Sequence, residues 1–162
     1  MDTPQVLVKK LDDCGAVPRY AYPGDAGADL ATIEDVRLAP GERKVVGTGI
    51  SVAIPVGYAG FVYPRSGLAA RKGLSIVNSP GVIDAGYRGE IRICLINTDP
   101  SSPIELARGD LVAQMVIQPV ASAGFRVVEV LSESARGDGG YGSSGGVADW
   151  GHGDGVSGGR VI

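Results

Sequence analysis

The stretch Gly81-Val82-Ile83-Asp84-Ala85-Gly86-Tyr87-Arg88-Gly89-Glu90-Ile91-Arg92 indicates more about the fold and chemistry of this chain than any other segment. Both ends have strand composition, and Gly86 and Gly89 supply the conformational freedom that a tight reversal needs. The pattern predicts a β-hairpin with Asp84 at its mouth. A turn alone needs neither the tyrosine nor the second glycine, which lets backbone approach a ligand closely.

A purely structural interpretation of this stretch stays open at this point. Asp84 can cap its own backbone through an Asx-turn, and the twelve residues taken alone favour that interpretation. The remainder of the chain is therefore needed to decide whether the carboxylate has a chemical role.

Length and composition predict one globular domain. The chain has 162 residues, of which 44% are hydrophobic and 20% charged, and its formal net charge is −3. Lys and Arg do not cluster, which argues against a general nucleic-acid surface. No segment resembles an export signal or a membrane span. Cys14 and Cys94 have neither metal-ligand spacing nor a disulfide framework, so we expect a reducing, cytoplasmic location.

Short β-type runs recur along the chain with Gly or Pro between them, and no long stretch shows a helical period. This spacing predicts an all-β fold, a jelly roll or β-sandwich. The expected strands are residues 5–11, 35–38, 45–54, 58–63, 74–77, 90–97, 111–120 and 125–131, with a short helix at 66–72. Residues 90–97 carry apolar side chains on both faces, which predicts a strand buried between two sheets.

The C-terminal part differs in composition from the rest. Glycine makes up 26 of the 162 residues, and many of them lie between residues 137 and 162. Such a segment cannot bury a core of its own. It contains the spacing G-x-G-x-x-G, but no helix follows within a βαβ unit, so a dinucleotide-binding fold is not predicted.

Several dispersed residues have the chemistry of a phosphate site. Asp29, beside a glycine, suits a water-mediated Mg²⁺ contact, although a simple turn explains it equally well. Arg65 and Ser66, at the start of the short helix, suit an anion, although Ser is also an ordinary helix cap. Asn78 has an amide that can pair with a planar ligand, and Gln114 can turn its amide to a phosphate or simply face solvent.

The Gly- and Ser-rich segment 136–146 adds one arginine, two hydroxyls and an aromatic ring. Arg136, Ser143 and Ser144 resemble a phosphate cradle, and Tyr141 could stack on a base.

Five of these segments, in this order, closely resemble the motifs of the homotrimeric dUTPases (dUTP pyrophosphatases), with an actinobacterial character. The motifs read DAGADL at 25–30, PRSGLA at 64–69, GVIDAGYRGE at 81–90, RGDLVAQ at 108–114 and RGDGGYGSSG at 136–145. Departures are small: Val82 stands where Thr is frequent, and Tyr141 where Phe is usual. The last sixteen residues or so have no counterpart in the family.

The resemblance implies a jelly-roll subunit with a flexible Gly-rich C-terminal arm, in a homotrimer whose active sites are shared between subunits. It implies a β domain at 1–135, an arm that closes the active site at 136–146 and a disordered tail at 147–162. The implied partners are dUTP and other copies of the chain, with no nucleic acid and no membrane.

The implied reaction is hydrolysis of dUTP to dUMP and pyrophosphate, which limits uracil in DNA and supplies dUMP for dTMP synthesis. Asp84 would be the general base for water attack on the α-phosphorus, and Asp29 would hold Mg²⁺ through water. The resemblance assigns the remaining site residues to substrate binding: Arg65, Ser66, Gly67, Asn78, Val82, Ile83, Tyr87, Arg92, Gln114, Arg136, Tyr141, Gly142, Ser143 and Ser144.

Two other functions stay open. A dCTP deaminase shares the implied fold but uses a Glu base and lacks the fifth motif, and its ammonia release would distinguish it. A homologue that binds nucleotide without catalysis, as a regulatory or partner-binding module, is the alternative from a different class. Such a homologue would lack at least one residue that catalysis needs, and this sequence has a residue of the expected type at every candidate catalytic position.

Overall fold

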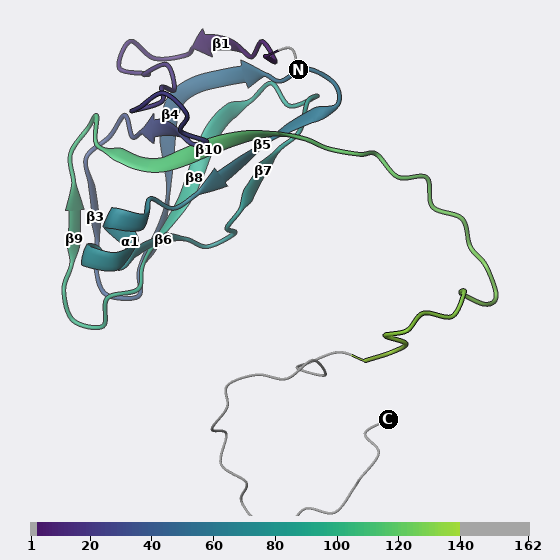
Figure 1. The fold of residues 1–162 in the computed structure, drawn as a ribbon. Helices are drawn as coiled ribbons and strands as arrows, with labels where there is room; N and C mark the ends of the chain where they lie inside the picture. The colour runs from purple at the N-terminus through teal and green to yellow at the C-terminus, as the bar shows by residue number, and fades with distance from the viewer. Residues whose placement is uncertain (1–2, 140–162) are drawn as a thin grey trace, which may run out of the picture. The chain divides into compact units, whose positions relative to one another are not determined.

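The computed structural model describes residues 3–139, and its contacts separate two units, Met1–Ala123 and Gly124–Ile162. The first unit contains all the regular elements (Figure 1). The strands are β1 (Leu7–Lys10), β2 (Ala28–Ala31), β3 (Val36–Leu38), β4 (Arg43–Ala53), β5 (Tyr58–Tyr63), β6 (Leu74–Ile76), β7 (Gly81–Ile83), β8 (Glu90–Asn97), β9 (Ile104–Leu106) and β10 (Leu111–Pro119), and the helix is α1 (Ser66–Lys72).

Two four-stranded antiparallel sheets enclose the core, which confirms the predicted all-β jelly-roll or sandwich class. One sheet has the order β1-β4-β8-β6 and the other β2-β10-β5-β7, while β3 and β9 form a separate pair. The apolar core takes side chains from both sheets, among them Ile50 and Leu95 from one and Val62 and Met115 from the other. Burial of these side chains between the sheets is the main stabilising contribution that the sequence can supply.

The predicted hairpin at residues 81–92 is wrong in its pairing. Strand β7 pairs with β5, whereas β8 pairs with β4 and β6 in the other sheet. The glycines and Asp84 therefore lie in a connection that crosses from one sheet to the other. Turn composition is the same whether the flanking strands pair with each other or with different partners, so local sequence does not separate the two arrangements.

Strand β8 alternates between buried and partly exposed residues, so the prediction that both of its faces are buried is wrong. Ile91, Ile93 and Leu95 are buried, whereas Cys94 is half-buried. Cys14 is exposed, and both cysteines are free thiols, as predicted.

The helix ends for a local reason. Gly73 follows it in the left-handed conformation, and its N–H donates to the carbonyls of Ala69 and Leu68. Glycine has no steric penalty at such a position. Because β5 leads directly into α1, the first turn of the helix lies at the end of a central strand of the β2-β10-β5-β7 sheet.

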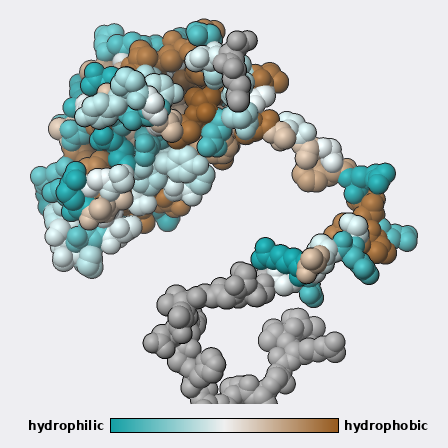
Figure 2. Space-filling view, viewed as in Figure 1, coloured by the Kyte–Doolittle hydropathy of each residue, from teal (hydrophilic) through white to brown (hydrophobic). Residues whose placement is uncertain are grey.

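Beyond the sheets, residues 125–131 form no strand, although their composition predicts one. In an extended segment without a neighbouring strand, backbone groups have no ladder partners within the unit. Phe125 is 98% exposed and Val127 is 100% exposed, and Figure 2 shows hydrophobic residues interleaved with hydrophilic ones along this part of the chain. The predicted boundaries at residues 135 and 146 stay predictions. No helix among the described residues is long and apolar enough to cross a membrane.

Candidate functional site

Most of the sequence-predicted site residues that the structure describes line one of two cavities. The first, which we call the Arg65 cavity, has a volume of about 410 Å³ and is lined by Ala21, Tyr22, Asp25, Ala26, Gly27, Asp29, Arg65, Ser66, Gly67, Leu68, Arg71 and Gln114. The second, the Asp84 cavity, has a volume of about 180 Å³ and is lined by Val82, Ile83, Asp84, Tyr87, Glu90, Ile91 and Arg92. The two cavities have no lining residue in common.

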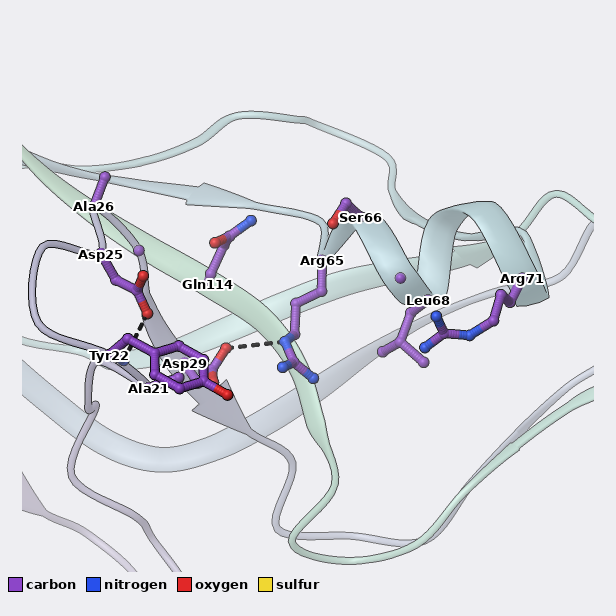
Figure 3. Close-up of a pocket in the computed structure, with 12 residues that line it drawn as sticks. Ala21, Tyr22, Asp25, Ala26, Asp29, Arg65, Ser66, Leu68, Arg71 and Gln114 are labelled. Atoms are coloured by element: carbon purple, nitrogen blue, oxygen red, sulfur yellow. Dashed lines mark hydrogen bonds and ion pairs between the residues drawn. The ribbon is translucent and has the colours of Figure 1, made fainter.

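In the Arg65 cavity, Asp29 and Arg65 form an ion pair (Figure 3). Asp29 lies on β2 and Arg65 at the junction of β5 and α1, and Arg65 Nε is 2.9 Å from Asp29 Oδ1. The Asp29 side chain is 12% exposed and the Arg65 side chain is 35% exposed. Arg65 Nη1 also donates to the Leu111 carbonyl (3.2 Å). The arginine is therefore held in place by two protein acceptors, with the remaining guanidinium donors available to the cavity.

Ser66 does not act as a helix cap. Arg65 is the N-cap residue, with extended backbone, and no side chain caps the helix. Ser66 is instead the first residue of α1, and its side chain lies at the cavity in Figure 3. Helix capping therefore does not explain the presence of a serine at position 66, and its hydroxyl is available to a ligand in the cavity.

Gln114 packs against Gly27 rather than simply facing solvent. Its Nε2 donates to the Pro64 carbonyl (2.9 Å), and a side chain at Gly27 would collide with Gln114 Oε1. Strand β10 lies between β2 and β5, so it brings the fourth motif alongside the first and the second. Gly27 is thus needed for close approach of the Gln114 amide, a role that reasoning from the sequence did not assign to it.

Asp25 has a structural task at the rim of the same cavity. Its Oδ2 accepts a hydrogen bond from the Tyr22 N–H (2.8 Å), and its own N–H donates to the Tyr22 carbonyl (3.2 Å). The turn interpretation of the first motif therefore applies to Asp25, whereas Asp29 lies on a strand and faces the cavity.

The Asp84 cavity lies where the chain passes from β7 to β8. The Tyr87 N–H donates to the Asp84 backbone carbonyl (3.0 Å), and the Asp84 side chain is exposed. No hydrogen bond between residues 3 and 139 involves the Asp84 carboxylate. The Asx-turn interpretation is therefore not supported, and the carboxylate is available as a proton acceptor at the cavity.

Tyr87 is fixed over Gly89 by a local hydrogen bond. Its hydroxyl donates to the Glu90 carbonyl (2.9 Å), and a side chain at Gly89 would collide with that hydroxyl. Glu90 is in turn anchored, since its Oε1 accepts from the Gly49 N–H (2.9 Å). The ring is thereby presented at the cavity in one orientation, about half exposed, as a flat apolar surface.

The structure places the other predicted residues as follows. Val82, Ile83 and Arg92 line the Asp84 cavity. Asn78 is exposed and lies close to Gly81 at the start of β7. Arg136 lies in the second unit, where its Nε donates to the Gly139 carbonyl (2.9 Å). The residues Tyr141, Gly142, Ser143 and Ser144 lie outside the described part of the chain.

Reasoning from the sequence missed Tyr22, Leu68 and Arg71 in the first cavity and Glu90 in the second. Arg71 had a detectable signal. Residues four apart on a helix share a face, and Arg71 follows Gly67 by four positions. Tyr22 had no comparable signal, because it lies in a loop whose path depends on distant contacts.

Comparison with known proteins gives consistent matches. A dUTPase family model matches residues 13–145. The chain is 62% identical over 146 residues to the deoxyuridine 5'-triphosphate nucleotidohydrolase of Thermobifida fusca, covering 90% of this chain and 82% of that relative. It is 62% identical over 143 residues to the protein of the same name from Nocardia farcinica, covering 88% and 87%. The predicted actinobacterial character is confirmed.

Solved structures agree with these relatives. A dUTPase of Staphylococcus bacteriophage 80alpha, solved with dUPNHPP, matches with a TM-score of 0.82 and 31% identity, covering 88% of this chain and 99% of that one. A mutant dUTPase from phage phi11 of S. aureus, described with a structural Mg(II) ion, matches with a TM-score of 0.74 and 28% identity, covering 80% and 99%.

Proposed function

The chain belongs to the dUTPase family and hydrolyses dUTP to dUMP, and from this premise we propose how its own residues perform the reaction. Two cavities with complementary chemistry carry the proposal. The Arg65 cavity offers guanidinium, hydroxyl and amide donors suited to a triphosphate, and the Asp84 cavity offers a free carboxylate beside a fixed ring.

One substrate molecule must contact both sets of residues, yet the two cavities of a single chain share no lining residue. We therefore infer that the Asp84 cavity of one copy faces the Arg65 cavity of another. Closed cyclic assembly repeats such a heterologous contact identically at every site. A homotrimer with active sites shared between subunits is the assembly that the family resemblance implies.

In the proposed reaction Asp84 orients a water molecule and takes one of its protons. The water oxygen forms a bond to the α-phosphorus, and the bond from that phosphorus to the bridging oxygen breaks with its electron pair on the departing pyrophosphate. Arg65, Ser66 and Gln114 would stabilise the charge that develops there. Asp29 contributes by holding the Arg65 guanidinium in place.

Magnesium fits the donor set only through its hydration shell. Among the described residues, no group of three or more His, Cys, Asp and Glu side chains is arranged to hold a metal. Asp29 uses one oxygen for Arg65, so its other oxygen would accept a hydrogen bond from a water ligand of an ion held mainly by phosphate oxygens. When bound, Mg²⁺ neutralises phosphate charge.

Selectivity for uracil and deoxyribose is assigned to the Asp84 cavity. Backbone groups from Val82 to Arg92, those of Ile83 among them, would pair with the uracil edge together with the Asn78 side chain. Tyr87 would pack flat on the deoxyribose, where a 2′-hydroxyl would meet the ring. Its hydroxyl bond to Glu90 supports this role, because a fixed ring is an effective steric barrier.

Replacing Tyr87 with Ala is expected to weaken rejection of UTP more than it lowers turnover of dUTP. The ring acts as a barrier, so its removal affects mainly the substrate that it excludes. The measurement is kcat/KM for both nucleotides, with Tyr87→Phe as the matched control that keeps the ring. An unchanged ratio of dUTP to UTP would remove Tyr87 from this role.

The proposed function is tested by pyrophosphate release from dUTP, dCTP, dTTP and UTP. We expect rapid release from dUTP alone. Ammonia release from dCTP would instead indicate a deaminase, and binding of dUTP without turnover would indicate a non-catalytic module.

The C-terminal arm completes the proposed site. Arg136 of the arm would bind phosphate together with Gly67 of α1. The arm residues Tyr141, Gly142, Ser143 and Ser144 would close over uracil and the terminal phosphates. The cellular consequence would be less uracil in DNA and a supply of dUMP for dTMP synthesis, in the cytoplasm.

A further inference from the structure

Arg71 is a cavity-lining cation that the expected site residues do not include. It lies in the last turn of α1, and Figure 3 shows its guanidinium at the opposite end of the Arg65 cavity from Asp25. The side chain folds back along the helix over Gly67, where an added Cβ would lie 2.9 Å from Arg71 Nη2. The absence of a side chain at Gly67 is what allows the guanidinium to lie there.

The two arginines of the cavity differ in how their donors are used. Arg65 is held by the Asp29 carboxylate and the Leu111 carbonyl. Within residues 3–139, Arg71 makes neither an ion pair nor a side-chain hydrogen bond. A guanidinium has five N–H donors, and those of Arg71 are not occupied by the described residues.

The formal charges of the residues that line the cavity also indicate a role for Arg71. Asp25, Asp29, Arg65 and Arg71 are its charged lining residues, so the two carboxylates cancel the two guanidinium groups. Without Arg71 the cavity would present a net negative charge to a polyanionic triphosphate, which like-charge repulsion disfavours. Arg71 therefore brings the formal charge of the cavity lining from −1 to zero, which removes the net repulsion of a triphosphate.

We propose that Arg71 binds the two terminal phosphates of the substrate and the pyrophosphate that departs. This assignment rests on the proposed function, because Asp84 must reach the water that attacks the α-phosphorus. With the α-phosphorus next to Asp84, the Arg65 cavity receives the two phosphates that follow the α-phosphate. Arg65 is held rigidly by Asp29, whereas Arg71 turns its free donors to the phosphate oxygens.

The test compares Arg71→Gln with Lys72→Gln, a matched control. Lys72 is the neighbouring cation in the last turn of α1 but does not line the cavity. Both substitutions remove one positive charge from the helix end, so a general effect on the helix dipole or on net charge would appear equally in both.

We expect Arg71→Gln to weaken binding of a non-hydrolysable dUTP analogue and inhibition by pyrophosphate by about 10- to 100-fold, the range for lost charge-assisted hydrogen bonds. Inhibition by dUMP should change by no more than about twofold, as for an ordinary surface substitution. Arg71→Lys should restore part of the pyrophosphate affinity, since it returns the charge without the planar fork.

Several results would overturn the assignment. One is an Arg71→Gln enzyme that binds pyrophosphate as the Lys72→Gln enzyme does, and another is an equal loss of affinity for dUMP. Thermal unfolding of each variant checks that the comparison is between folded proteins. Failure of the wild-type enzyme to release pyrophosphate from dUTP would reject the proposed function itself, so the two failures are distinguishable.

Discussion

Replacing Asp84 with Asn is expected to lower kcat for dUTP by about 10² to 10⁴, the usual loss for a missing general base. The substitution keeps the size and shape of the side chain, and the carboxylate makes no hydrogen bond among the described residues that folding would need. Affinity for a non-hydrolysable dUTP analogue and the assembly state should therefore stay close to those of the wild type.

Two measurements decide this prediction. Steady-state kinetics give kcat, and equilibrium binding of the analogue reports whether the cavity is intact. Asp13→Asn is a suitable control, because it removes one exposed negative charge at a residue that lines neither cavity. Near-normal turnover by the Asp84→Asn enzyme would exclude this carboxylate as the base.

Ending the chain after Ala135 is expected to lower kcat/KM by about 10² or more, the loss typical of removing preorganised donors for transition-state charge. The truncation removes Arg136 and the proposed closing residues, Tyr141 and Ser143 among them. It leaves the whole apolar core, which lies between Leu30 and Met115. Thermal unfolding and the assembly state should consequently change little.

Ending the chain after Gly146 is the matched control for that truncation. It removes the last sixteen residues but keeps every residue assigned to the substrate. We expect nearly unchanged kinetics. The proposed role of the arm is wrong if the shorter chain, verified as folded, hydrolyses dUTP as well as the longer one.

Local sequence was sufficient to predict the bounds of elements that end at a nearby Pro or Gly. The predicted bounds of β5, α1 and β8 agree with the structure, because a Pro or Gly follows or precedes each of them closely. Strands β2 and β9 were missed. Each is short and follows a Gly- or Pro-containing turn, so too few residues remain to show an alternation of apolar and polar side chains. Their strand character depends on pairing with β10 and β3, respectively.

The candidate site was predictable by residue type but not by arrangement. Asp29, Arg65, Ser66 and Gln114 were all identified, and they do line one cavity. Local sequence does not show their separation from Asp84, because it follows from the antiparallel pairing of β5 with β7. That pairing places Asp84 beside the start of β5, whereas Arg65 follows the end of the same strand. The pairing of Asp29 with Arg65 was missed for the same reason: it joins two strands that lie on either side of β10.

The central claim, that each site combines the Asp84 cavity of one copy with the Arg65 cavity of another, is tested most directly by mixing two inactive variants. Asp84→Asn disables the Asp84 cavity. Ser66→Asp places a carboxylate at an exposed position of the Arg65 cavity, where it repels phosphate. Each variant alone should be nearly inactive, because every one of its sites carries the defect.

Random mixing of the two chains in a ring should give about a quarter of the sites an intact pair of cavities. We therefore predict that denatured and co-refolded mixtures, with mixed trimers verified by mass, recover about that fraction of wild-type kcat, whereas the unmixed parents do not. Mixed trimers with no activity above the parents would contradict the shared site.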